Sequence, residues 1–125
     1  MAKFFLLTAA MSGCLAVCIG AFAAHGLKAQ LSTDMLAVFR TGVDYQFYHT
    51  LALLAVALLL KPLEQSTALN VSGGLFIAGI VLFSGSLYAL ALGGPKWLGP
   101  ITPLGGICFI IAWGAMVWAA ARSNF

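Results

Sequence analysis

Residues 4–24 read FFLLTAAMSGCLAVCIGAFAA and contain no charged side chain. A transmembrane helix needs about 20 consecutive, predominantly apolar residues to cross roughly 30 Å of hydrocarbon. A secretory signal peptide has a shorter apolar core, of about 7–15 residues. We therefore expect residues 4–24 to form a membrane-spanning helix rather than a cleaved signal peptide.

Three more apolar stretches follow, and we expect them to span the membrane over residues 43–61, 69–92 and 99–121. Gly26 can end the first helix in a left-handed conformation. Ser32 supplies a capping oxygen for a new helix, whose first part, residues 32–44, is a polar helical connection. Residues 1–125 are therefore predicted to form one all-α integral membrane domain. Its fold is a compact bundle of four transmembrane helices with both termini on the same side.

The composition agrees with a membrane protein, because 62% of the 125 residues are hydrophobic and only 7% are charged. Soluble domains carry about 25% charged residues. Four spans use most of the chain and leave no room for a soluble catalytic or binding domain. The net charge of +3 comes without a cluster of Lys or Arg, which argues against nucleic acid as a partner. The expected partner is the lipid bilayer.

The cations divide equally between the two membrane faces that this topology predicts. Lys3, Lys61 and Arg122 fall on the face with the termini (side A), and Lys28, Arg40 and Lys96 on the opposite face (side B). The positive-inside rule therefore does not distinguish the two orientations. The terminal amine favours termini in the cytoplasm.

Polar side chains gather toward side B, and these residues are the candidates for binding a ligand: His25, Arg40, Asp44, Tyr45, Gln46, Tyr48, His49, Ser84, Ser86, Tyr88 and Thr102. Arg40 and Asp44 are spaced i, i+4 and share a helix face. They form either an interfacial ion pair that anchors the helix or one wall of a polar pocket.

His49 is expected within the membrane, where an ionisable residue is a functional candidate by default. The alternative is a neutral imidazole that bonds Tyr88 or a serine across a helix contact. With His25 and Asp44 it could also bind a metal ion. Two histidines are fewer than the ligand set of a typical zinc site, so we predict neither a metal nor a cofactor.

Small residues recur every four positions at Ser12, Ala16, Gly20 and Ala24, and again at Gly74 and Ala78. Such rows let helices approach closely in lipid, either within the chain or between subunits. Cys14 and Cys18 are interpreted as small apolar residues rather than redox groups, and with Cys108 they do not form a secreted disulfide framework. Glycines at Ser84-Gly85-Ser86 and Gly105-Gly106 could mark interrupted helices of the transporter type, although four helices leave little room for two gates in a monomer.

Four blocks resemble the small bacterial inner-membrane proteins of the YgdD/YwdK type, which have the eukaryotic transmembrane protein 256 as a relative. The blocks are GAFAAHGL at 20–27, FRTGVDYQFYHTLALL at 39–54, FSGSLYALAL at 83–92 and WLGPITPLGG at 97–106. Ala23 departs from the glycine expected there. The resemblance implies four spans and a multi-pass location in the bacterial plasma membrane, and it implies no activity, substrate or catalytic residue.

Three functions are compatible with this sequence. The favoured hypothesis is a non-catalytic membrane protein that packs with itself as a homo-oligomer, with lipid, or within a larger membrane complex. The first alternative is a binding or transport module for a small amphiphile, lipid, quinone or proton-linked solute, through the polar cluster around His49. The second alternative is a metal-dependent membrane enzyme that uses His25, His49 and Asp44.

Overall fold

The computed structural model describes residues 1–63 and 66–125. In this part of the chain, four helical segments are long and apolar enough to cross a membrane. The first two are α1 (Ala2–His25) and α2 (Thr33–Leu59). The third consists of α3 (Thr67–Gly79), the π-helical turn η1 (Ile80–Ser84) and α4 (Gly85–Ala91), and the fourth of the 3-10 turn η2 (Lys96–Leu98) and α5 (Ile101–Ala121). The predicted all-α fold with four spans is confirmed.

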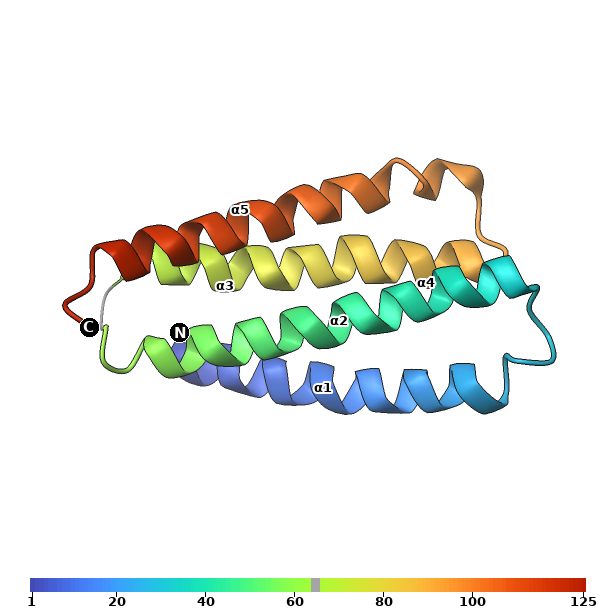
Figure 1. The fold of residues 1–125 in the computed structure, drawn as a ribbon, viewed down its shortest axis with the longest axis horizontal. Coiled ribbons are helices and arrows are strands. Elements are labelled where there is room, and N and C mark those ends of the chain that lie inside the picture. Colours follow the sequence, from blue (N-terminus) through green and yellow to red (C-terminus); the bar gives the residue numbers. More distant parts are fainter. Residues whose placement is uncertain (64–65) are drawn as a thin grey trace.

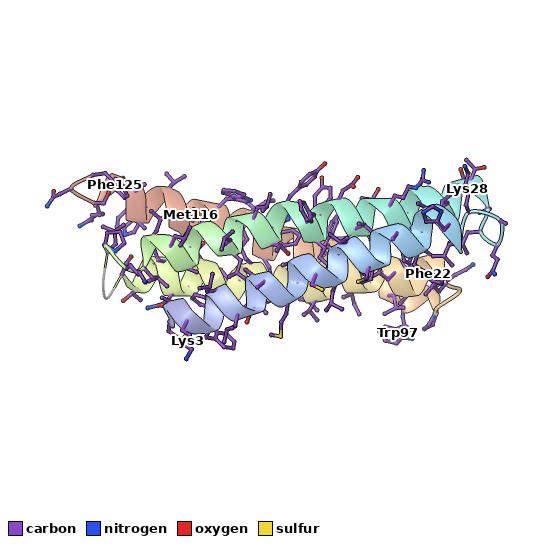
Figure 2. All side chains as sticks on the ribbon, turned by 90° about the horizontal axis from the view of Figure 1, so that it is seen from below. Lys3, Phe22, Lys28, Trp97, Met116 and Phe125 are labelled. Atoms are coloured by element: carbon purple, nitrogen blue, oxygen red, sulfur yellow. The ribbon has the colours of Figure 1, made fainter. Side chains whose placement is uncertain are left out.

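The bundle is flattened, with α2 and the α3–α4 segment in the middle and α1 and α5 on the flanks (Figure 1). Helix α1 packs mainly on α2, and α5 packs mainly on α3. Both termini lie at one end, as predicted (Figure 1). Lys3 and Phe125 mark that end, side A, while Phe22, Lys28 and Trp97 mark side B (Figure 2). The candidate residues of α4 and the first candidates of α2, from Arg40 to Tyr45, therefore lie in the side-B half, whereas Tyr48 and His49 lie near the middle of α2.

Helix α1 ends at His25, but Gly26 does not take the expected left-handed conformation. Its φ is −75°, and its N–H donates to the Phe22 carbonyl at 2.8 Å as the next residue of the helix would. The predicted cap of the second helix is confirmed, because the Ser32 side chain accepts a hydrogen bond from the Met35 N–H at 3.2 Å. A positive φ of 91° occurs instead at Gly93, in the turn before η2.

Helix α2 has 27 residues, which at 1.5 Å per residue makes it about 40 Å long. It exceeds the hydrocarbon thickness of roughly 30 Å. The predicted polar connection is thus the first part of α2. If the last turns of α2 lie at the side-A interface, its first turns extend beyond the hydrocarbon at side B.

Close helix contacts depend on glycines that face aromatic side chains. A Cβ atom on Gly73 would lie 2.5 Å from the Phe5 ring, so this ring joins α1 to α3. A Cβ on Gly79 would collide with the Phe109 ring of α5. The tightest backbone approach is between Gly105 and Phe83, where a Cβ would lie 2.8 Å from the Phe83 Cα. These contacts fix α1 and α5 against the middle layer.

The predicted row of small residues on α1 follows the real interface only in part. Ala16 is buried and a Cβ on Gly20 would lie 3.3 Å from Val43 of α2, but Ala24 is exposed and Ala23 is buried in its place. Four residues turn an α-helix by about 400°, so an i, i+4 row drifts steadily off the contact face. Ala24 therefore does not pack against another helix of this chain, and its place in a contact between subunits stays a prediction.

The third span departs from the prediction in the same way. Gly74 is exposed, a Cβ added to it would have no atom within 4 Å, and the internal contact belongs to Gly73. Ala78 is half-buried. Gly74 therefore does not hold the helices of this chain together.

Candidate functional site

A chain of hydrogen bonds crosses the middle of the bundle and joins three helices. The Ser12 and Thr50 hydroxyls lie 2.7 Å apart, linking α1 to α2. The Gln46 side chain donates from Nε2 to the Ser12 carbonyl at 3.0 Å and accepts at Oε1 from the Tyr88 hydroxyl at 2.6 Å. Gln46 thus satisfies both ends of its amide while it connects α1, α2 and α4. Thr50 was not predicted as part of this site, because nothing in its sequence context distinguishes it from other intramembrane threonines.

The serines of the third span also bond to neighbouring helices. Ser84 donates to the Gly42 carbonyl of α2 at 2.6 Å, and Ser86 shares a hydrogen bond with Thr102 of α5 at 2.5 Å. Ser72, which the sequence did not single out, donates to the Ala112 carbonyl of α5 at 2.8 Å. Hydrogen bonds of this kind hold helices together in membranes.

The π-helical turn η1 positions two of these serines. It precedes α4, and both Ser84 and Ser86 are buried while Gly85 between them is exposed. Because α3, η1 and α4 follow one another without a gap, the third span is a continuous helix. The unwound break that transporter-type helices use is not found at Ser84-Gly85-Ser86.

His49 is packed among aromatic rings rather than exposed to an opening. Only 6% of its surface is accessible, and its ring stacks on Phe109 with 3.5 Å between centroids and an interplanar angle of 6°. Phe76 and Trp113 lie farther out, with ring centroids 5.7 and 6.2 Å away. Its Nδ1 lies 2.7 Å from the Tyr45 carbonyl of its own helix, an arrangement in which Nδ1 carries the proton and donates. The alternative considered for His49, a bond to Tyr88 or a serine across a helix contact, does not form.

The three residues considered for a metal ion do not come together. His25 ends α1 at side B, whereas His49 lies 16 residues into α2 from Thr33, about 24 Å along the helix axis. In residues 1–63 and 66–125, no three His, Cys, Asp or Glu side chains are close enough to share a metal ion. The pairing of His25 with His49 is therefore ruled out by their positions along the bundle.

Arg40, Asp44 and Tyr48 face outward from α2, and all three are exposed. The expected ion pair does not form, since no Arg or Lys nitrogen comes within 4.0 Å of a carboxylate oxygen in the described part of the chain. Tyr45 is 38% exposed and stacks on Phe83, with 4.6 Å between ring centroids. The residues predicted as one cluster thus divide into an internal set, which bonds helix to helix, and an outward set on α2.

A groove of about 290 Å³ runs between α1 and the third span. Its walls are mainly apolar, and Ser12 and Gln46 are among its lining residues: Thr8, Met11, Ser12, Leu15, Gln46, Ile77, Ile80 and Val81. His49 does not line it. The groove follows from the placement of α1, which leans on α2 and reaches the third span mainly through Phe5.

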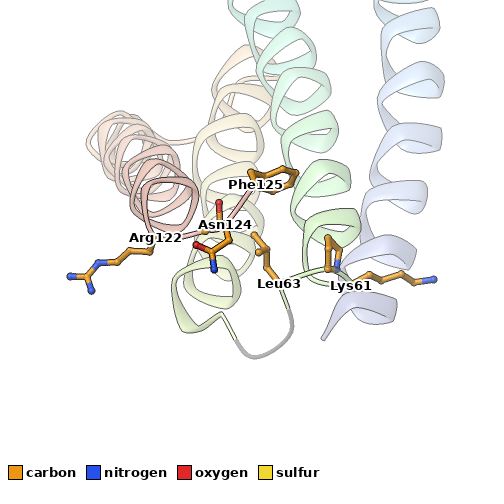
Figure 3. Close-up of a pocket in the computed structure, with 7 residues that line it drawn as sticks. Lys61, Leu63, Arg122, Asn124 and Phe125 are labelled. Carbon is orange, nitrogen blue, oxygen red and sulfur yellow. The ribbon is translucent and has the colours of Figure 1, made fainter.

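A second hollow, of about 560 Å³, lies at side A where the C-terminal tail folds toward the end of α2. Lys61 and Arg122 line it, but their side chains point away from each other and out of the hollow (Figure 3). The two cations therefore do not converge on a common anion.

The comparison with known families decides the identity. The family described as "Protein of unknown function (DUF423)" matches residues 19–106. The chain belongs to the DUF423 family. The predicted resemblance is confirmed, and the matched range contains Gln46, Tyr88 and the Ser86–Thr102 pair, while Ser12 precedes it.

Relatives of this DUF423 protein match it over nearly their whole length. It is 47% identical to the UPF0382 membrane protein YwdK of Bacillus subtilis, over 96% of this chain and 98% of the relative. It is 42% identical to a UPF0382 membrane protein of Haemophilus influenzae, over 96% and 95%. It is 38% identical to the UPF0382 inner membrane protein YgdD of Escherichia coli, over 96% and 91%. No solved structure matches. The protein is a multi-pass membrane protein of this family.

Proposed function

We propose that this DUF423 protein is a non-catalytic membrane protein that acts through its outward helix surfaces, by packing with itself, with lipid or within a larger membrane complex. The use of the polar side chains supports this proposal. Ser12, Gln46, Tyr88, Ser84 and Ser86 each bond another helix or another bonded side chain. General acid–base catalysis instead needs a group within hydrogen-bond reach of a substrate.

The outer surface supports the same proposal, because large apolar side chains cover it (Figure 2). Ile110 of α5 is 72% exposed and Val81 of the third span is 65% exposed. Such surfaces face lipid or another helix in a bilayer, where association depends on packing and on hydrogen bonds between helices. These exposed apolar side chains are the surfaces that the four spans offer to a partner within the membrane.

We place the chain in the bacterial plasma membrane with both termini in the cytoplasm. The printed name of the Escherichia coli relative specifies the inner membrane, and the terminal amine joins three cations on side A. A fusion of alkaline phosphatase to the C-terminus is expected to be inactive, whereas a green fluorescent protein fusion is expected to fluoresce. An active phosphatase fusion would reverse the orientation.

Native mass spectrometry of protein released from lipid nanodiscs tests the proposed function. We expect a multimer, a co-purifying membrane protein or retained phospholipid, without a stoichiometric metal ion. Metal analysis of the same sample provides the control. A lone monomer with one bound metal ion per chain would contradict the proposal and favour the enzyme hypothesis.

A second candidate function, binding of an amphiphile, is supported by the groove between α1 and the third span. Its apolar walls suit an acyl or isoprenoid chain such as that of a quinone or lipid. Two of its polar lining residues are already bonded, because Gln46 donates to the Ser12 carbonyl at 3.0 Å and the Ser12 hydroxyl bonds Thr50. The recognised part of the ligand would therefore be its apolar chain.

Filling the groove tests this candidate. Ile77→Trp places a large ring in the groove, and Val71→Trp is a matched control on the same helix, 47% exposed and away from the groove. A bound amphiphile seen by native mass spectrometry should be lost in Ile77→Trp and kept in Val71→Trp. Equal retention in both variants would exclude the groove as its site.

A further inference from the structure

The outward face of α2 carries both signs of charge near side B. Arg40 and Asp44 lie one turn apart, with small residues beside them at Ala37 and Thr41, and all four residues are exposed. Thr41 satisfies its own hydroxyl by donating to the Ala37 carbonyl at 3.0 Å. In the described part of the chain, the Asp44 carboxylate has neither an ion-pair partner nor a hydrogen-bond donor. The face therefore carries two opposite charges without partners.

The depth of this face makes an unpaired carboxylate costly. Helix α2 ends at Leu59, immediately before the Leu60–Lys61 turn at side A, and about 20 residues cross the hydrocarbon. If Leu59 lies at the side-A interface, the roughly 20 residues that cross the hydrocarbon begin at Arg40. Arg40 then lies at the side-B interface, and Asp44 lies one helical turn inside the membrane. Arginine reaches water along its apolar stem, but aspartate has a single methylene and cannot. A partner for Asp44 must therefore come to it within the bilayer.

A lipid headgroup fits these charges poorly. An anionic headgroup that binds Arg40 would meet the Asp44 carboxylate one turn deeper. In a zwitterionic phosphatidylethanolamine the ammonium group lies no deeper than the phosphate, whereas this face requires the positive group at the deeper position. The order of the charges along α2 is thus opposite to that of the headgroup.

We propose that the outward face of α2 binds the same face of a second copy of this chain, with Arg40 of each copy paired to Asp44 of the other. This inference rests on the proposed function and names one of its partners. Two parallel copies related by a twofold axis along the membrane normal bring identical faces together, so each contact occurs twice. The two residues differ in depth by about 6 Å, which an extended arginine spans.

The neighbouring side chains fit such an interface. Ala37 and Thr41 are small, and small residues let two helix backbones approach closely. Tyr48 is 57% exposed one turn below Asp44 and extends the contact toward the membrane centre. The wider face is thus polar at the interface and aromatic inside the membrane.

Charge exchange between two differently tagged copies tests the proposal. In Arg40→Asp alone, carboxylates face carboxylates across the twofold axis, and in Asp44→Arg alone, guanidinium groups face each other. When the two variants are co-expressed, each Asp meets an Arg of the other copy. We expect either single variant to associate with itself roughly tenfold more weakly than wild type, and the mixed pair to regain association. Pull-down of one tag from nanodiscs, followed by quantification of the other, measures this.

The mixed pair separates this proposal from an ion pair within one helix, because neither variant can form that pair alone. Lys96→Asp, a charge change at side B outside α2, is the control and should not weaken association. Circular dichroism shows whether each variant is folded, and Asp44→Asn provides a milder change that should weaken association without repulsion. If wild type dimerises and the charge variants associate equally well, the proposed interface is wrong but the proposed function stands. A monomeric wild type without bound lipid or protein would overturn both.

Discussion

Gly105→Ala tests whether α5 is held by backbone contact with the π-helical turn. A Cβ at this position would lie 2.8 Å from the Cα and from the Cβ of Phe83, whereas ordinary contact begins at 3.4 Å. These atoms belong to or lie next to the backbone, so no side-chain rotation can relieve the overlap. Helix α5 or η1 must shift by about half an ångström or more, since overpacked sites relax by moving backbone.

The expected cost is about 1–3 kcal/mol of unfolding free energy, the usual range for overpacking. Gly114→Ala in the same helix is the matched control, because no atom lies within 4 Å of its Cβ position. That variant should be neutral or more stable by up to about 1 kcal/mol, since alanine is the better helix former. Two substitutions of identical chemistry in one helix therefore have opposite expected signs.

Equilibrium unfolding in mixed micelles, followed by circular dichroism, measures both variants against wild type. If Gly105→Ala is as stable as Gly114→Ala, the close approach of Gly105 to Phe83 does not exist in the membrane. The positions of Ser86 and Thr102, which depend on this contact, would then need revision.

Three further predictions use the same unfolding assay. Gly73→Ala should lower the free energy of unfolding by about 1–3 kcal/mol because its Cβ would overlap the Phe5 ring, whereas the adjacent Gly74→Ala should not lower it. Equal effects would contradict the assignment of Gly73 to the inward face of α3 and of Gly74 to the outward face. Gln46→Leu should lower the free energy of unfolding by about 1–2 kcal/mol because it removes the bonds to Ser12 and Tyr88. Tyr88→Phe removes only the second of these bonds and should lower the free energy less. A larger effect of Tyr88→Phe would contradict the chain of hydrogen bonds through Gln46. His49→Ala should lower the free energy of unfolding by roughly 3 kcal/mol because it opens a cavity, and the stability of His49→Phe should stay within about 1.5 kcal/mol of wild type. A larger loss of stability in His49→Phe would indicate a polar role of His49 that packing does not explain.

The number and approximate limits of the helices could be predicted because apolar length and turn residues determine them. Ser32 begins α2 as expected, since its capping oxygen acts within one turn. The faces of the helices were harder to predict. The buried small residue near the end of α1 is Ala23 and not Ala24, because a row spaced by four residues drifts off the contact face of a helix.

The sequence predicts which residues belong to the candidate site, but it does not predict which partner each side chain bonds. Gln46, Tyr88 and Ser86 do face inward, and Arg40 and Asp44 do share a face. Which partner each side chain meets depends on the axial offset between helices, which local sequence does not specify. Ser72, which bonds the Ala112 carbonyl of α5, was missed for this reason. The partner of His49 was missed because a carbonyl of its own helix lies closer than any side chain across the bundle.

Disulfide cross-linking in native membranes tests most directly whether this protein acts through an outward helix face. In a chain with Cys14, Cys18 and Cys108 replaced by alanine, Thr41→Cys places one thiol on the outward face of α2. Leu104→Cys places one on α5, where the side chain is 55% exposed. We predict that mild oxidation yields a cross-linked dimer with Thr41→Cys and little with Leu104→Cys. Equal cross-linking at both positions, or none at Thr41→Cys while the chain is folded, would contradict the account.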